Sequence, residues 1–285
     1  MQNRLQTNAQ FIQRSMEIIL NHKCFLILPL INLIINIGLF VLIFTPLVQF
    51  EKSLWEQNAH PGGKTIFIFC VIFLIYLTIS SLISLLFHVA QSSYAIKHIN
   101  NEPCTLRSCF IRALKNIKQI YYYKLLCDTF FPVIRLLEYW MDTWPNTKFA
   151  TQTLSQLPFR VAMYLAIPIL SNEKTPAFQA LKRSAQLIKN TWGISLRPRM
   201  TMNATMIWLH VLSLIPILTA IIIGGKIILI IGTVISVILF FCVSTLYTTA
   251  HIILTSALYL FALKNKNTAR FYEDSLLDNA FQPKS

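Results

Sequence analysis

The stretch that decides the fold is Ile227–Leu263, which reads IILIIGTVISVILFFCVSTLYTTAHIILTSALYLFAL and contains no Asp, Glu, Lys or Arg. A helix needs about 20 consecutive apolar residues to cross the hydrocarbon core of a bilayer. This stretch is therefore long enough to span a membrane. Four further runs have the same character: Phe25–Val48, Thr65–Ala90, Leu154–Leu170 and Thr205–Gly225.

A sixth run, Ile117–Leu137, is interrupted by Lys124, Asp128 and Arg135. At a rise of about 1.5 Å per residue it is still long enough to cross. We therefore predict an all-α fold, a polytopic transmembrane helical bundle of about six spans. The transmembrane domain takes residues 1–263, and residues 264–285 form a C-terminal tail.

The composition places the chain among membrane proteins. Of its 285 residues, 55% are hydrophobic and 13% are charged, whereas soluble domains carry about 25% charged residues. The first run is too long for a cleaved signal peptide and no small-x-small site follows it, so we expect a retained anchor. The six cysteines show no disulfide or metal-binding framework.

Basic residues collect in alternate gaps between the apolar runs. Residues 1–24, 95–118, 171–204 and the tail have an excess of Lys and Arg, whereas the other gaps together are neutral. Short loops rich in Lys and Arg stay in the cytoplasm. The pattern predicts that both termini are cytoplasmic, which requires an even number of spans. Anionic lipid head groups, not nucleic acid, account for the net charge of +14.

Three amphipathic segments are predicted on the cytoplasmic side, at residues 10–23, 105–117 and 176–192. Thr105 and Thr175 are expected N-caps, with Pro176 in the first turn and Gly193 just past the end of the third segment. These helices either lie in the membrane interface or act as elbows that fix hairpins of spans. Their interfacial basic residues are Arg107, Arg112, Lys115, Lys182, Arg183 and Lys189.

Two of these segments share a short motif. Arg14-Ser15-x-x-Ile18-Ile19-x-Asn21 aligns with Arg183-Ser184-x-x-Leu187-Ile188-x-Asn190. Each copy leads into a hairpin of apolar runs. An internal repeat is one explanation, and chance similarity is the other.

Several stretches resemble a family of bacterial six-span membrane proteins known only as a domain of unknown function. The most specific is Ala180-Leu181-Lys182-Arg183-Ser184 followed by Thr191-Trp192-Gly193. The others are Arg14-Ser15, Leu28-Pro29-Leu30, Pro168-Ile169-Leu170 and the tail Ala280-Phe281-Gln282-Pro283-Lys284. The chain departs from the family at Met16, where a Trp is common. The resemblance implies the six-span fold and a multi-pass location in the bacterial inner membrane, and it implies no activity.

Asp128 is the one acidic residue within a predicted span, near the bilayer midplane. An ionisable group at that depth is a functional candidate by default. The alternative is structural, because Lys124 lies one turn away and could neutralise the carboxylate.

Two predicted spans carry polar stripes. The first stripe is Thr78, Ser81, His88 and Ser92, and the second is Thr233, Ser236, Ser244, Thr248, His251 and Thr255. Hydroxyls at helical spacing allow helices to pack closely and to hydrogen-bond across their interface. The sharper hypothesis is a wet pathway in which His88 and His251 relay protons or bind a ligand.

No enzyme motif is present in the sequence, and no cofactor or metal is implied. The leading hypothesis is a non-enzymatic integral membrane protein that organises lipid or binds a membrane partner, including a second copy of itself. The alternative is a small transporter or channel that uses Asp128 and the two stripes.

Overall fold

The computed structural model describes residues 13–56, 63–142, 162–192, 196–198, 202–264, 272, 277 and 281–283. Residues 13–21 are helical. The other helices are α2 (Cys24–Glu56), α3 (Gly63–Ile99), α4 (Leu106–Lys115), α5 (Ile117–Asp142), α8 (Ala166–Asn172), α9 (Ala177–Trp192), α10 (Met202–Ser213), α11 (Ile215–Ile223) and α12 (Lys226–Ala262). The predicted helical fold is confirmed, with one addition. The three-residue strands β1 (Leu196–Pro198) and β2 (Phe281–Pro283) form an antiparallel pair.

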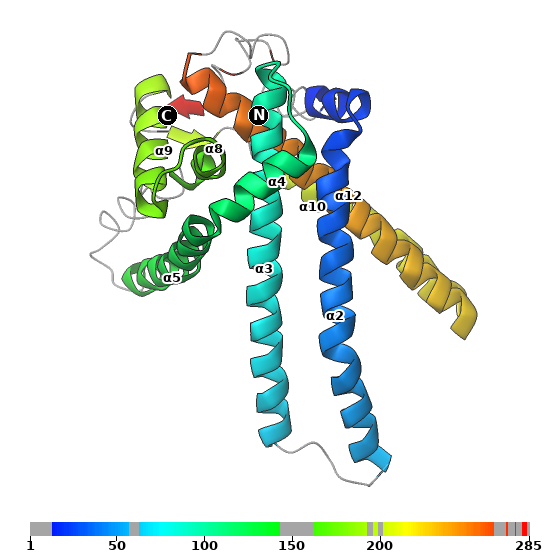
Figure 1. The fold of residues 1–285 in the computed structure, drawn as a ribbon. Coiled ribbons are helices and arrows are strands. Elements are labelled where there is room, and N and C mark those ends of the chain that lie inside the picture. Colours follow the sequence, from blue (N-terminus) through cyan, green and yellow to red (C-terminus); the bar gives the residue numbers. More distant parts are fainter. Residues whose placement is uncertain are drawn as a thin grey trace.

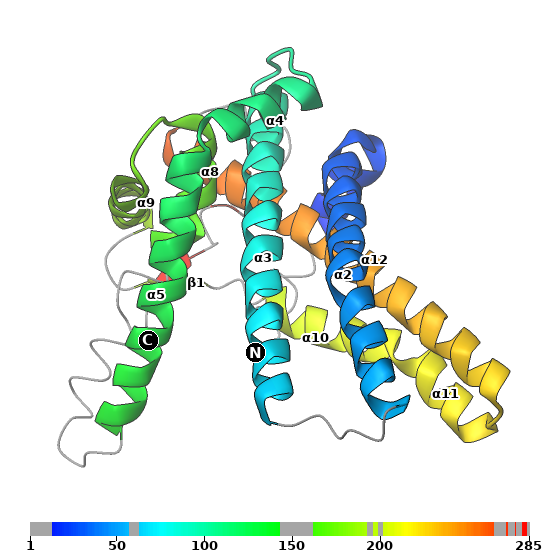
Figure 2. The same ribbon diagram turned by 60° about the horizontal axis from the view of Figure 1, so that its bottom comes forward.

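The helices form a packed head from which three arms diverge (Figures 1 and 2). We define the head as helical residues 13–21, α4, α8 and α9, together with the ends of α2, α3 and α12 that pack against them. The first arm is the α2–α3 hairpin, the second is α5, and the third is α10 and α11 packed along α12. Residues 13–21 and β2 both lie at the head.

Burial is concentrated in the head. Ile19, Leu165, Ile169 and Leu254 are each at most 1% exposed and belong to one apolar cluster. Because these residues come from segments far apart in the sequence, the head ties both ends of the described chain into a single core.

The large exposed side chains of α3 and α12 are apolar along the arms. On α3 the large exposed apolar side chains run from Phe67 to Ile79, and burial begins at Leu86; on α12 they run from Ile227 to Phe240, and continuous burial begins at Thr249. The part of each helix that lies before this burial, residues 67–85 and 227–248, is about 20 residues long, or roughly 30 Å at 1.5 Å per residue. That length equals the thickness of a bilayer's hydrocarbon core.

Within the described residues, three helices are long and apolar enough to cross a membrane: Cys24–Leu47, Phe67–Ile99 and Ile227–Ala262. The helical stretch Ile207–Ile223 is apolar but shorter. The doubtful sixth run lies within α5, a continuous helix. The run Leu154–Leu170 falls partly outside the described residues, and its described end is buried in the head. The count of six spans therefore remains a prediction.

Glycine and proline residues shape the third arm. Gly224 and Gly225, with φ of +78° and +97°, form the turn between α11 and α12. The helix before this turn breaks at Leu214, next to Pro216, because proline cannot donate a helical hydrogen bond. Gly232 allows α11 and α12 to approach closely, since a Cβ there would lie 2.7 Å from the Pro216 carbonyl oxygen.

The N-cap predictions have different outcomes. The Thr105 hydroxyl accepts a hydrogen bond from the Ser108 amide, which confirms Thr105 as the N-cap of α4. The prediction for Thr175 is wrong. Helix α9 begins at Ala177, the Pro176 carbonyl accepts from the Ala180 amide, and the buried Thr175 hydroxyl has no hydrogen-bond partner among the described atoms.

Candidate functional site

Asp128 forms an ion pair with Lys124 on its own helix, α5. The Asp128 side chain is 53% exposed on the protein surface, and that of Lys124 is 17% exposed. Among the described residues, no ion pair or hydrogen bond joins either side chain to His88 or His251. The geometry thus corresponds to the structural alternative, in which a pair one turn apart neutralises itself.

Most hydroxyls of the two polar stripes bond to their own helix. The hydroxyls that donate to a carbonyl three or four residues earlier are Thr78, Ser81, Thr233, Thr248 and Thr255. Ser236 instead accepts from the Ile217 amide at 2.9 Å, beside the α10–α11 break. Hydroxyls bound in this way satisfy the backbone or fasten helices to each other.

The structure brings His88 and His251 together at the point where α3 and α12 enter the head. His88 and His251 each lie about one turn before Ser92 and Ser256, whose hydroxyls are 2.9 Å apart between the two helices. The ring of His251 lies 5.6 Å from the ring of Tyr164 and 6.0 Å from that of Tyr247. The two stripes therefore approach each other at this level, and the pathway hypothesis stays a prediction.

One turn farther into the head, three serines join three helices. The hydroxyls of Ser92 on α3 and Ser256 on α12 lie 2.9 Å apart, and Ser171 on α8 donates to Ser92 at 3.3 Å. All three side chains are buried. This cluster has the packing role expected of small hydroxyl residues between membrane helices.

The polar contacts continue to the surface of the head. Tyr259 donates to the Glu173 carboxylate at 3.0 Å and accepts from Asn172 at 3.1 Å. Glu173 in turn lies 3.9 Å from the Arg183 guanidinium. The described hydrogen bonds of Ser256 and Tyr259 link α12 to α3 and to the end of α8, and the Glu173–Arg183 ion pair continues from there to α9.

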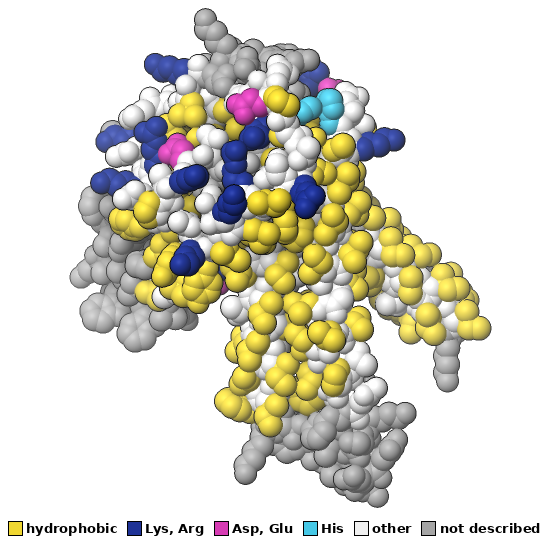
Figure 3. Space-filling model, viewed as in Figure 1, with side chains coloured by type: hydrophobic (Ala, Val, Ile, Leu, Met, Phe, Trp, Pro, Cys, Tyr) yellow, Lys and Arg dark blue, Asp and Glu magenta, His cyan; other side chains and the backbone are white. Residues whose placement is uncertain are grey.

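The predicted interfacial cations occupy the outside of the head. Arg107, Arg112 and Lys115 on α4 and Lys182, Arg183 and Lys189 on α9 are all exposed. Figure 3 shows Lys and Arg side chains gathered over the head and hydrophobic side chains covering the arms. The opposite face of α9, including Leu181 and Ile188, is buried in the head core.

The repeated motif has the same burial in both copies. Ser15 and Ser184 are fully buried, and so are the two apolar residues that follow each by three and four positions. Ser15 is hydrogen-bonded to Tyr272, whereas Ser184 accepts from the Leu165 amide. The motif is thus a docking element of the head, which is a role that the sequence alone did not assign.

The tail docks onto the same region. Trp192 donates to the carbonyl of Leu277 at 3.1 Å, and β2 pairs with β1 just after α9. Tyr272 and Leu277 are at most 1% exposed. Burial raises the pKa of the Tyr272 phenol well above its ordinary value, and its hydrogen bond with Ser15 opposes this increase.

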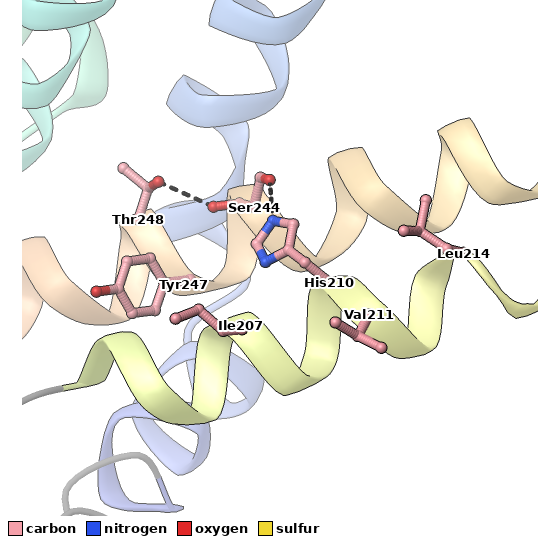
Figure 4. Close-up of a pocket in the computed structure, with 7 residues that line it drawn as sticks. All are labelled: Ile207, His210, Val211, Leu214, Ser244, Tyr247 and Thr248. Carbon is pink, nitrogen blue, oxygen red and sulfur yellow. Dashed lines mark hydrogen bonds between the residues drawn. The ribbon is translucent and has the colours of Figure 1, made fainter.

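A groove between α10 and α12 holds a residue that sequence reasoning missed, His210 (Figure 4). Its Nε2 lies 2.8 Å from the Ser244 hydroxyl, and its ring packs 4.5 Å from that of Phe240. The cavity volume is about 580 Å³, and its lining is Ile207, His210, Val211, Leu214, Ser244, Tyr247 and Thr248. The available signal in the sequence was a histidine within an apolar run. Its partner Ser244 lies on a different helix, so the spacing of residues along the chain does not reveal the contact.

The arms mark the chain as a membrane protein, by the length and composition of their helices. More particularly, the chain belongs to a family of unknown function, DUF6159, whose model matches residues 66–269. This match confirms the predicted membership of a family without an assigned activity. No curated protein and no solved structure matches the chain.

Proposed function

We propose that this protein is a multi-pass, non-enzymatic membrane protein that organises lipid, with its head in the cytoplasm of a bacterial cell and its arms in the inner membrane. The head would hold anionic lipid head groups through its exposed cations, and both termini would be cytoplasmic. A membrane partner or a second copy of the chain would bind the same basic face of the head.

The observation that carries this proposal is the separation of charge from apolar surface. The exposed cations of α4 and α9 lie on the head, whereas the large exposed side chains of α3 and α12 are apolar and lie on segments that extend about 30 Å beyond the head. Cations at the end of membrane helices attract anionic leaflets, at about 1 kcal/mol for each residue near the surface. Divergent arms also leave more surface for lipid than a closed bundle would.

Transport is the less favoured function. Asp128 pairs with Lys124, and most stripe hydroxyls bond to their own helix. A conduction pathway uses polar groups that face a shared wet cavity. Here the ion pair and the hydroxyl hydrogen bonds direct these polar groups to partners on their own helices.

The test is lipid retention. Protein extracted with its native lipids is compared with a variant that carries Arg112→Gln, Lys182→Gln and Lys189→Gln, and the retained lipids are quantified by mass spectrometry. Arg183 is left intact because it lies beside Glu173. We expect the parent to be enriched in anionic lipid over the bulk membrane, and the variant to lose that enrichment.

The matched control keeps the charge at two of the same positions: Lys182→Arg and Lys189→Arg should retain the parental lipid ratio. Equal enrichment in the parent and the neutralised variant would rule out the basic face as a lipid-binding surface.

A further inference from the structure

The groove between α10 and α12 has the composition of a site for an amphipathic molecule. Ile207, Val211 and Leu214 line the α10 side, and Ser244 and Thr248 line the α12 side. The volume of about 580 Å³ falls within the range of about 300–1,000 Å³ typical of small-molecule sites. One wall is therefore apolar and the other carries hydroxyl groups.

The groove lies open beside the third arm. Its lining comes from α10, the α10–α11 junction and α12, and the apolar members are 46–63% exposed. Apart from Thr219, their exposed neighbours on this arm from Leu212 to Ile223 are apolar as well. Since the arm has the surface of a membrane-embedded hairpin, the medium at the opening is lipid.

The position of the groove selects one leaflet. His210 lies about 21 Å along the helix from the turn at Gly224 and Gly225, and Ser244 lies about 27 Å along α12 from the same turn. Ser244 is only five residues from Thr249, where burial in the head begins, so the groove lies at the head end of the arm and falls in the leaflet on the side of the head. The groove then extends from the acyl chains of this leaflet, at Leu214, to the boundary between its acyl chains and its head groups, at Thr248.

The polar pair at this boundary matches the chemistry of a lipid ester. When His210 Nε2 carries the proton, it donates to the Ser244 oxygen, and the Ser244 O–H can itself donate to a further acceptor. An ester carbonyl is an acceptor without a proton of its own. The apolar wall formed by Ile207, Val211 and Leu214 suits the chain attached to that ester.

We propose that this groove binds one acyl chain of a glycerophospholipid from the leaflet next to the head, with the chain's ester at His210 and Ser244. The inference deepens the proposed lipid-organising function by naming a binding site. It depends on the embedding of the arm and not on the cations of the head, so a zwitterionic phospholipid would bind as well.

The test is photo-cross-linking in cells whose phospholipids carry a diazirine in the acyl chain. After irradiation, peptide mapping compares Ile207–Leu214 and Ser244–Thr248 with Ile221–Ile223, which is 58–83% exposed on the same arm. We expect lipid adducts to be enriched in the groove over this control stretch. We expect Val211→Trp to remove the enrichment by filling the groove, whereas Ile222→Trp should leave it unchanged.

Equal labelling of the groove and Ile221–Ile223 in the parent would overturn the proposal, and this comparison needs no variant to fold. Protein–protein adducts at the groove in place of lipid adducts would also overturn it, because the occupant would be another chain. The variant with neutralised head cations separates the two proposals. If the parent shows no enrichment in anionic lipid but the groove is still labelled in parent and variant, only the proposed role of the basic face is contradicted.

Discussion

The phenol oxygen of Tyr272 and the hydroxyl oxygen of Ser15 lie 2.7 Å apart, although 257 residues separate them along the chain. Both side chains are buried, at 1% and 0% exposure. This contact joins the two ends of the described chain inside the head. It makes the tail a structural part of the core, together with the Trp192–Leu277 hydrogen bond.

We therefore expect Tyr272→Phe to destabilise the head, because the buried Ser15 hydroxyl would lose its partner. An unsatisfied buried hydroxyl costs about 1–3 kcal/mol. The measurement is the free energy of unfolding in micelles, with Tyr122→Phe, at an exposed tyrosine, as the control. Adding Ser15→Ala to Tyr272→Phe should cost less than the sum of the single changes; strict additivity would show that the contact carries no coupling energy.

The same phenol predicts sensitivity to alkaline pH. Burial raises the pKa of Tyr272 in the folded protein, whereas the phenol has a pKa of about 10 in the unfolded chain. Its contribution to stability is then complete below about pH 10 and is lost as the pH rises from there toward the folded pKa. Protease cleavage of the tail should accelerate above about pH 10, and Tyr272→Phe should remove the part of the acceleration that this phenol causes. Identical pH profiles for parent and variant would exclude Tyr272 as the titrating group.

The sequence predicts the elements of the arms better than their arrangement. Apolar length identifies α2, α3 and α12, and the residues around Gly224 and Pro216 identify the turn and the break. Divergence of the arms could not be predicted, because lipid-facing and protein-facing surfaces of a membrane helix are both apolar. Hydropathy also does not show that the C-terminal ends of α3 and α12 are buried in a packed head.

At the candidate sites, the sequence predicts a local contact but not the long-range ones. The Lys124–Asp128 pair is local, at a spacing of four residues, and the sequence could place it. The contacts of Ser15 and His210 are with residues 257 and 34 positions away, and no local periodicity encodes them.

The Lys124–Asp128 pair predicts a compensating double change. Asp128→Asn leaves the Lys124 ammonium without its counter-ion, and an unpaired lysine within a membrane helix costs about 2.5–3.5 kcal/mol on insertion scales. Lys124→Met combined with Asp128→Leu removes both charges and should restore stability close to that of the parent. The measurement is thermal unfolding in nanodiscs. A double variant less stable than Asp128→Asn alone would contradict the structural role of the pair.

Gly232 predicts a steric effect in the third arm. An alanine Cβ would meet the Pro216 carbonyl oxygen and, at 2.5 Å, the Ala220 Cβ. Overpacking of this kind costs about 1–3 kcal/mol, so Gly232→Ala should lower the melting temperature. The matched control is Gly38→Ala on α2, where nothing lies within 4 Å of the added Cβ. The account of the α11–α12 contact fails if both substitutions shift the melting temperature alike.

The central claim is that the arms lie in hydrocarbon while the head stays in water. Spin labels test it most directly, placed one at a time at Cys70 on α3, at Cys242 on α12 and at Gln186→Cys on α9, three exposed positions, with the other cysteines replaced by serine. In liposomes we predict that oxygen relaxes the labels at Cys70 and Cys242 more strongly than a water-soluble nickel chelate does, and that this order reverses at Gln186→Cys. Greater relaxation by the nickel chelate than by oxygen at Cys70 and Cys242 would contradict the account.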